Sequence, residues 1–206
     1  MASREIEPLE ATPGTTGPGI VVKIANPRER EIAIARRAEI YTAELGHHGL
    51  DEYDRGAVHL VALDEGGEML GACRLLGPQP LPTELEGFVQ LGSLLPCGGY
   101  SMQAGGLWVL KHKVDLKRRI FVALALWRRA LSLAAKTGAT ALVVRTLPRL
   151  SPYYRSVGFQ SLSQALFHDP TWETATLMFR PIGEAHRSRG GSVRYREQAV
   201  EPALAS

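Results

Sequence analysis

The fold is decided by the stretch from Gly105 to Phe159, which reads GGLWVL (105–110), KHKVDLKRRIFVALALWRRALSLAAKTG (111–138), ATALVVRTL (139–147) and PRLSPYYRSVGF (148–159). The short apolar run Leu107–Leu110 is typical of a buried strand. From Asp115 onward, apolar residues recur at helical spacing, at Ile120, Leu124, Trp127, Leu131 and Ala134. Gly138 indicates the end of that helix, and the β-rich run Ala141–Thr146 predicts a second buried strand. The stretch therefore predicts a strand, a helix, a strand and a short final helix.

Six basic residues surround the start of the predicted long helix. The unpaired N–H groups and the positive end of the helix dipole lie at the same place, which favours the binding of an anion such as pyrophosphate. Solvated charges at a helix entry are the alternative, and the basic cluster alone fits both interpretations. The residues are Lys111, His112, Lys113, Lys117, Arg118 and Arg119.

Two motifs in this stretch resemble those of GNAT-type acyltransferases. Arg118–Ala123 is similar to the R-x-x-G-x-A pyrophosphate loop of that family, and Tyr154–Phe159 is similar to its Y-x-x-x-G-F motif. The first motif departs at Phe121, where the family usually has a glycine that lets the backbone approach phosphate closely. The resemblance implies that the pantetheine arm of a thioester donor inserts between two splayed strands. It implies these donor-binding residues: Leu107, Trp108, Val109, Leu110, Lys117, Arg118, Arg119, Val122 and Ala123.

The resemblance also implies a catalytic role for Tyr154. Ser151 and Pro152 predict the start of the short helix at 151–156. Tyr154 takes the place of the family's tyrosine that donates a proton to the departing thiolate. A phenol has a reference pKa of about 10, so it is protonated at neutral pH and can donate. The adjacent Tyr153 is predicted to be a packing residue.

Length and composition limit the class of protein. A chain of 206 residues with 45% hydrophobic and 22% charged residues can bury one substantial core. The net charge of +3 favours a small anionic ligand or a carrier over nucleic acid, for which no reading motif is present. We expect a flexible leader at 1–18, a single GNAT-like domain at 19–182 and a disordered tail at 183–206. Two cysteines, with neither a signal peptide nor a membrane-length apolar run, predict a cytoplasmic protein.

The residues before the central stretch predict a strand, a helix and a hairpin. Gly19–Ala25 is an apolar strand candidate, and Asn26–Glu29 combines an N-cap, a proline and the glutamate of a capping box. A helix should therefore run from Pro27 to about Leu45, with inward residues that include Ile32, Ala35, Ile40 and Tyr41. Two alternating segments, 58–63 and 69–76, flank a glycine turn and predict the hairpin.

The hairpin region narrows the resemblance. The segments DEYD (51–54), HLVALD (59–64) and LGACRLLGP (70–78) resemble the N-terminal half of the acyl-homoserine-lactone (autoinducer) synthases and the related N-acyl amino acid synthases, which typically take acyl chains from acyl carrier protein. The resemblance implies a substrate-binding group of Asp51, Asp54 and Arg74, and a helix near Pro82–Leu95. Autoinducer synthases carry a glutamate and a Ser-Arg pair on the next strand, and residues 103–110 have neither.

The charged residues of this region permit two interpretations. Asp51 and Asp54 either cap local structure while Arg74 pairs with one of them, or they attract the ammonium of an acceptor. In the second case Arg74 orders the acids or binds a carboxylate bidentately. Both interpretations place the three side chains close together.

Other chemistry-bearing residues receive simpler predictions. Cys73 should face the core, and Cys97 is expected to be an inert thiol. The adjacent His47 and His48 are predicted to be solvated turn residues, so no metal site is expected. Glycines inside a strand, at Gly105–Gly106, predict a bulge or a close approach of another group to the backbone.

Together these observations and the resemblance predict an α+β protein with a GNAT-like mixed, mostly antiparallel sheet of six or seven strands, flanked by about four helices. The implied activity is transfer of an acyl group from a thioester to the amine of a small molecule. No permanently bound cofactor is expected, and the co-substrate is acyl-CoA or the phosphopantetheine of acyl carrier protein. Acyl carrier protein is therefore a possible protein partner. Neither nucleic acid nor a membrane is an expected partner. The general base stays open among Asp51, Asp54, His59 and water. The alternative is a non-catalytic GNAT-like module that binds an acyl carrier or a partner protein.

Overall fold

A computed structural model of the chain describes residues 14–15, 19–47, 49–79, 85, 101–162, 167–169 and 173–182. The helix expected near Pro82–Leu95, apart from the single residue Leu85, lies outside the described residues. The same holds for His48, for Cys97 and for the segment 183–206.

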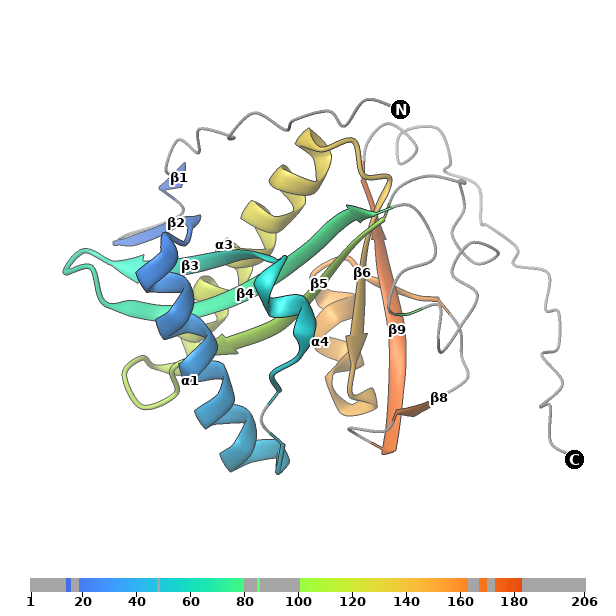
Figure 1. Ribbon diagram of the computed structural model, residues 1–206, viewed down its shortest axis with the longest axis horizontal. Helices are drawn as coiled ribbons and strands as arrows, with labels where there is room; N and C mark the ends of the chain where they lie inside the picture. Colours follow the sequence, from blue (N-terminus) through green and yellow to red (C-terminus); the bar gives the residue numbers. More distant parts are fainter. Residues whose placement is uncertain are drawn as a thin grey trace, which may run out of the picture.

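One mixed sheet organises the molecule (Figure 1). Its strands follow the order β1-β2-β3-β4-β5-β6-β9-β7, and β8 pairs with β9. β5 and β6 run parallel, and the other pairs are antiparallel. The strands are β1 (Gly14–Thr15), β2 (Ile20–Ile24), β3 (Val58–Asp64), β4 (Met69–Gln79), β5 (Ser101–Val109), β6 (Ala141–Thr146), β7 (Gln160–Ser161), β8 (Phe167–Asp169) and β9 (Glu173–Pro181). The predicted mixed, mostly antiparallel sheet is confirmed, and β1 adds a short edge strand within the segment expected to be a leader.

The helices begin and end where local signals predict. They are α1 (Pro27–Leu45), α3 (Leu116–Lys136) and α4 (Ser151–Ser156), with the short 3-10 helices η1 (Glu52–Arg55) and η3 (Pro148–Leu150). Asn26 and Glu29 form the expected capping box of α1. The side chain of Asp115 caps α3 by accepting from the backbone N–H of Arg118 at 2.7 Å.

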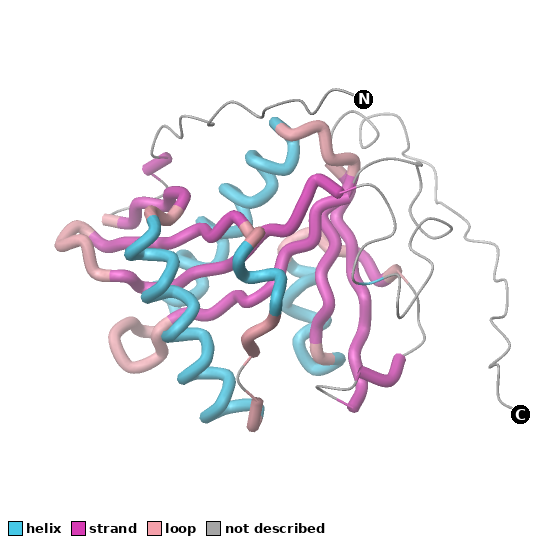
Figure 2. The backbone as a smooth tube through the Cα atoms, viewed as in Figure 1, coloured by secondary structure: helices cyan, strands magenta, loops and turns pink. Residues whose placement is uncertain are grey.

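The helices cover opposite faces of the sheet (Figures 1 and 2). On the α1 face, Ala33 packs with Val61, Ala72 and Trp108. On the other face, Trp127 of α3 lies in the main core with residues of six strands and with Tyr154 of α4. Successive residues of a strand point to opposite faces, so Cys73 belongs to the main core while Arg74 faces α1. The prediction for Cys73 is confirmed, and burial raises the pKa of its thiol to about 12.

Three predicted inward residues are exposed. In α1, Ile32 and Ala35 point to solvent, and the buried positions are Ala33 and Arg37. In α3, Ile120 is exposed because its turn precedes the part of the helix that packs on the sheet. The prediction was wrong for Ile32 and Ala35 because the inward stripe contains an arginine, which a rule based on apolar periodicity does not count. Ile40 packs against the core as predicted.

The two central strands separate at one end. β5 and β6 pair from Ser101–Ala141 to Ala104–Val144, and no pairing joins them beyond that point. We call the ends of the two strands beyond Ala104 and Val144 the splay. This divergence agrees with the expectation that the strand pair opens.

Candidate functional site

A group of paired charges lies on the α1 face of the sheet, near the splay. Arg74 donates to both carboxylate oxygens of Asp51, each at 2.5 Å, and to Oδ1 of Asp54 at 3.0 Å. Asp51 also caps η1, because its side chain accepts from the N–H of Tyr53 at 3.0 Å. The structure thus brings together the three residues proposed from the sequence, and Asp51 combines the capping contact with the ion pair.

Arg37 is a member of this group that the sequence analysis missed. Its Nη2 donates to Oδ2 of Asp54, and its side chain is only 3% exposed. Asp54 therefore lies between two guanidinium groups, Arg37 from α1 and Arg74 from β4. The spacing of Ala33, Arg37 and Tyr41, four residues apart on one helix face, is the sequence signal that could have found it.

The environment decides the protonation of Asp54 and His59. Burial opposes ionisation of Asp54, but the hydrogen bonds and charges of Arg37 and Arg74 outweigh it and lower the pKa of this carboxyl. Burial lowers the pKa of His59, although Asp54 acts in the opposite direction. Nε2 of His59 lies 3.1 Å from the backbone oxygen of Asp54, which can only accept, so this nitrogen carries the proton. Asp54 is therefore a poor candidate for a general base, whereas His59 is neutral and has its lone pair on Nδ1.

A bulge and a glycine of β5 make room for the guanidinium group of Arg37. Opposite Ala72–Arg74 of β4, the β5 register shifts from Trp108 to Gly105, which marks a bulge. Gly106 has φ of 60°, and a Cβ there would lie 2.6 Å from Nη1 of Arg37. The predicted bulge and close approach are both confirmed, and the approaching group is the Arg37 side chain.

Gly106→Ala is expected to destabilise the protein by at least about 2 kcal/mol, because the left-handed backbone strains any Cβ and the new methyl group displaces Arg37. Gly105→Ala is the matched control, since its Cβ would meet nothing nearer than Nε of Arg74 at 3.8 Å. Urea unfolding of both variants measures the difference. Equal midpoints for the two variants would contradict the role given to Gly106.

Tyr154 lies at the end of β6, on the face opposite to α1. Its side chain is buried and shares a hydrogen bond with Thr146, the last residue of β6. Its ring makes edge-to-face contacts with Trp127 and Phe159, at centroid distances of 5.7 and 5.5 Å. Burial raises the pKa of Tyr154, and the neighbouring Tyr41 and Tyr153 add to this effect. The phenol therefore keeps its proton at neutral pH beside the splay.

Tyr153 has a different environment from Tyr154. Its hydroxyl accepts a hydrogen bond from Nε1 of Trp127 at 3.1 Å. The indole N–H of this core residue is thereby satisfied. The contact fits the packing role expected for Tyr153.

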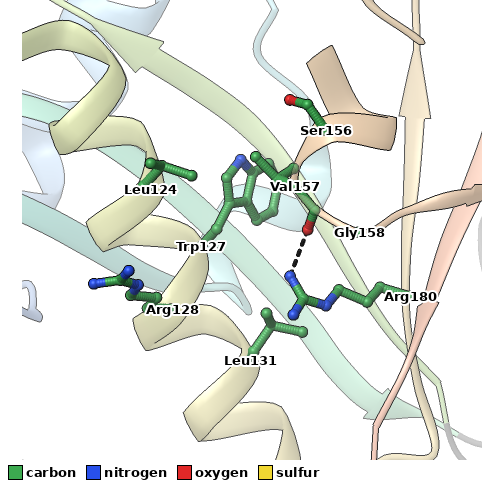
Figure 3. A pocket seen from close by; sticks show the side chains of 8 residues that line it. All are labelled: Leu124, Trp127, Arg128, Leu131, Ser156, Val157, Gly158 and Arg180. Atoms are coloured by element: carbon green, nitrogen blue, oxygen red, sulfur yellow. Dashed lines mark hydrogen bonds between the residues drawn. The ribbon is translucent and has the colours of Figure 1, made fainter. Parts of the chain in front are cut away.

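The loop after α4 is held by an arginine of β9. Nη1 of Arg180 donates to the carbonyl of Val157 at 2.5 Å. Gly158 has φ of 89°, and a Cβ there would lie 3.2 Å from Cζ of Arg180. Figure 3 shows this contact beside a groove between α3 and the end of α4, with Trp127 in its wall. The groove has a volume of about 360 Å³. The glycine of the Y-x-x-x-G-F motif therefore lets Arg180 fix the turn that ends α4, the helix that carries Tyr154.

The basic loop before α3 is partly neutralised. Lys111 pairs with Glu44 at 2.7 Å, and Lys113 pairs with Glu68. Because Asp115 occupies the N–H of Arg118, an anion at this helix terminus would meet fewer free donors and a nearby carboxylate. Phe121 is 49% exposed, and Lys117 and Arg118 are exposed beside it.

The other predicted donor-binding residues divide into two groups. Val122 is fully buried against β4, where a Cβ at Gly71 would touch it, and Ala123 is also buried. Trp108 packs on the α1 face and donates from Nε1 to the carbonyl of Ala33 at 3.2 Å, so it is a core residue there. Leu107 and Val109 are half-buried on β5, Leu110 is buried after it, and Arg119 is half-buried on α3.

Two further observations concern the described part of the chain. Its His, Cys, Asp and Glu side chains form no group that could hold a metal ion. None of its helices has the length and apolar character needed to cross a membrane.

Comparison with known proteins identifies the fold. No protein-family model matches the sequence, and no curated protein matches it. Among solved structures, FeeM, an N-acyl amino acid synthase from uncultured soil microbes, is 20% identical, with 83% of this chain and 94% of that chain covered and a TM-score of 0.66. The AHL synthase LasI is 16% identical, with 81% and 92% covered and a TM-score of 0.57. A putative N-acetyltransferase from Lactobacillus plantarum is 15% identical, with 80% and 99% covered and a TM-score of 0.60. Since an acetyltransferase of the GNAT family from Staphylococcus aureus is also similar, at a TM-score of 0.54, the chain has the GNAT-type fold expected from its motifs.

Proposed function

We propose that this protein is an N-acyltransferase that moves an acyl group from a pantetheine thioester to the amine of a small molecule. The observation that carries the proposal is the splay of β5 and β6 with the buried phenol of Tyr154 at its β6 end. In this interpretation the thioester lies at the splay. Tyr154 protonates the sulfur, and backbone N–H groups of β5 polarise the carbonyl.

The acceptor would approach from the α1 face, where the charged group lies. Asp51 is less buried than Asp54, with its side chain 33% exposed against 10%, and it can attract an ammonium while Arg74 holds it in place. Asp54 is closed off between two arginines and serves to order them. The activities named for FeeM and LasI support an acceptor that is a small amine, such as an amino acid.

The start of α3 favours a donor carried on a protein over free coenzyme A. A pyrophosphate would meet the Asp115 carboxylate and the Phe121 side chain at the place where the family usually has a close backbone approach. The exposed apolar side chains Leu116, Ile120 and Phe121, beside Lys117 and Arg118, suit an acidic carrier protein with an apolar contact surface. We therefore propose acyl carrier protein as the preferred donor.

Mass spectrometry tests the proposed activity. The purified protein is incubated with decanoyl-CoA or decanoyl-acyl carrier protein and with a panel of amino acids and simple amines. An acylated amine that forms only with the protein supports the proposal. Binding of the carrier protein without any product would instead support a non-catalytic module.

Phe121→Gly tests the donor preference. Removal of the side chain restores backbone access to phosphate, so we expect coenzyme A to bind more tightly and activity with decanoyl-CoA to rise severalfold relative to the carrier-bound donor. Calorimetry with coenzyme A and the ratio of the two rates measure the effect. The control is Arg118→Ala, which should weaken both donors, since each charged hydrogen bond contributes about 1.5–3 kcal/mol. If Phe121→Gly leaves coenzyme A affinity unchanged, the donor is anchored elsewhere.

A further inference from the structure

The ring of Tyr41, near the end of α1, is fixed by the turn that follows the helix. The backbone of Gly49 lies against it so closely that a Cβ at Gly49, which has φ of 59°, would be 2.3 Å from Cδ2 of Tyr41. The imidazole of His47 meets the ring edge-on at 5.6 Å, and its Nδ1 accepts from the N–H of Gly49 at 3.0 Å. His47 and Gly49, which follow α1, therefore hold the ring of Tyr41 in one orientation, a role that the prediction of a solvated turn histidine did not include.

The hydroxyl of this tyrosine reaches the splay. It donates to the backbone carbonyl of Leu107 at 3.4 Å, on the part of β5 that lies beyond the last pair with β6. On the other strand, Thr146 bonds Tyr154 at a comparable distance from that last pair. Tyr41 therefore lies at the β5 side of the splay, on the α1 face, and Tyr154 lies at the β6 side, on the α4 face. They interact electrostatically, since Tyr41 contributes to the raised pKa of Tyr154 after burial itself.

Burial keeps the hydroxyl of Tyr41 neutral although three arginines lie near it. Burial raises the pKa of Tyr41, and the guanidinium groups of Arg37, Arg74 and Arg145 act against burial without cancelling it. The phenol therefore retains its proton at neutral pH. Because that proton is directed at the carbonyl of Leu107, the lone pairs of the oxygen are available to a donor.

We propose that Tyr41 is a second substrate-contacting tyrosine, whose oxygen accepts an N–H of the attacking amine and aims the nitrogen at the thioester carbonyl. This inference rests on the proposed acyl transfer and assigns the acceptor's reactive end to the α1 side of the splay. Tyr41 and Tyr154 would have opposite hydrogen-bonding roles in the reaction. Tyr41 accepts from the nucleophile, and Tyr154 donates to the leaving group.

The reaction balances without any further reagent. The lone pair of the neutral amine forms the C–N bond at the thioester carbonyl carbon, and the electron pair of the C=O bond moves onto oxygen. When that pair returns, the C–S bond breaks and the sulfur takes the proton of Tyr154. The surplus proton on nitrogen leaves to water, and water reprotonates Tyr154. The products are an amide and a thiol.

Tyr41→Phe tests the assignment with two nucleophiles that do not depend on the natural acceptor. Decanoyl-pantetheine, the part shared by both donor types, is mixed with wild type or variant, and hydroxylamine is added to give decanoyl hydroxamate. Hydrolysis to decanoic acid is followed in the same samples without hydroxylamine. The variant should form hydroxamate roughly tenfold more slowly, a loss at the lower end of what a positioned group contributes. The loss of hydroxamate formation should exceed any loss of hydrolysis severalfold, and the Tm should stay within a few degrees because the ring and its contacts remain.

Each outcome decides between the proposals. Equal hydroxamate rates in wild type and Tyr41→Phe would overturn the role of Tyr41 and leave the acyl transfer intact. An equal loss of hydroxamate formation and hydrolysis would also overturn it, since Tyr41 would then act on the donor or on the fold. A wild-type protein that accelerates neither reaction over the enzyme-free mixture would overturn the proposed function, and this inference with it.

Discussion

Tyr154→Phe is expected to lower kcat for acyl transfer by roughly 10²- to 10⁴-fold while donor binding stays nearly intact. The thiolate that leaves a thioester needs a proton, and a positioned acid typically contributes a factor of this size. Phenylalanine keeps the edge-to-face contacts with Trp127 and Phe159 and removes only the hydroxyl that bonds Thr146. Steady-state kinetics with decanoyl-acyl carrier protein, together with calorimetry for donor affinity, measure the two effects separately.

Tyr153→Phe provides the matched control on the same helix, and its expected effect is of a different kind. The change removes the acceptor of the Trp127 indole N–H and should cost about 1–3 kcal/mol in the free energy of unfolding, with kcat little changed. A wild-type kcat in Tyr154→Phe would mean that water protonates the sulfur. A larger loss of kcat at Tyr153 would place the acid one residue earlier.

Arg37→Ala is expected to destabilise the protein by about 3–5 kcal/mol, the usual cost of removing one partner from a buried ion pair. The change leaves Asp54 with one guanidinium in place of two and opens space beside Gly106. It should also raise the pKa of Asp54, since a cation that favours the carboxylate is lost. Urea unfolding gives the stability, and NMR titration of the carboxyl gives the pKa.

The neighbouring Arg36→Ala is the control for the Arg37 variant. Arg36 is 52% exposed and pairs with Glu39 on the outer face of α1, so its loss should change stability by no more than about 0.5 kcal/mol. If both variants unfold at the same urea concentration, the charged group on the α1 face does not contribute to folding. Its residues would then be free to act only in binding.

The sequence by itself determined the elements that depend on near neighbours. Asn26 and Glu29 form a capping box within one turn, and Asp115 caps α3 through a residue three positions away. The alternation of β3 and β4 fixed which residues face the core, because a strand turns successive side chains to opposite faces. The motifs around Arg118 and Tyr154 also indicated the fold correctly, since short motifs and their spacing are linear information.

The sequence also placed part of the charged group. Asp51, Asp54 and Arg74 were expected to lie together, and they do. The resemblance supplied this expectation, and the hairpin geometry made it plausible. The resemblance did not distinguish the role of Asp51 from that of Asp54. Asp54 is enclosed, and Asp51 is left partly exposed, by contacts with other segments of the chain.

Only the tertiary structure decided the position of Arg37, the environment of Tyr41 and the packing of Trp108 against α1. Arg37 is buried because Asp54, 17 residues away, neutralises it and because Gly106 leaves room for it. Tyr41 reaches Leu107 across 66 residues, and Trp108 bonds Ala33 across 75. An arginine or a phenol has a high cost of burial alone and a low cost beside the right partner. Since that partner is chosen by the packing of distant segments, no local pattern of residues could have named it.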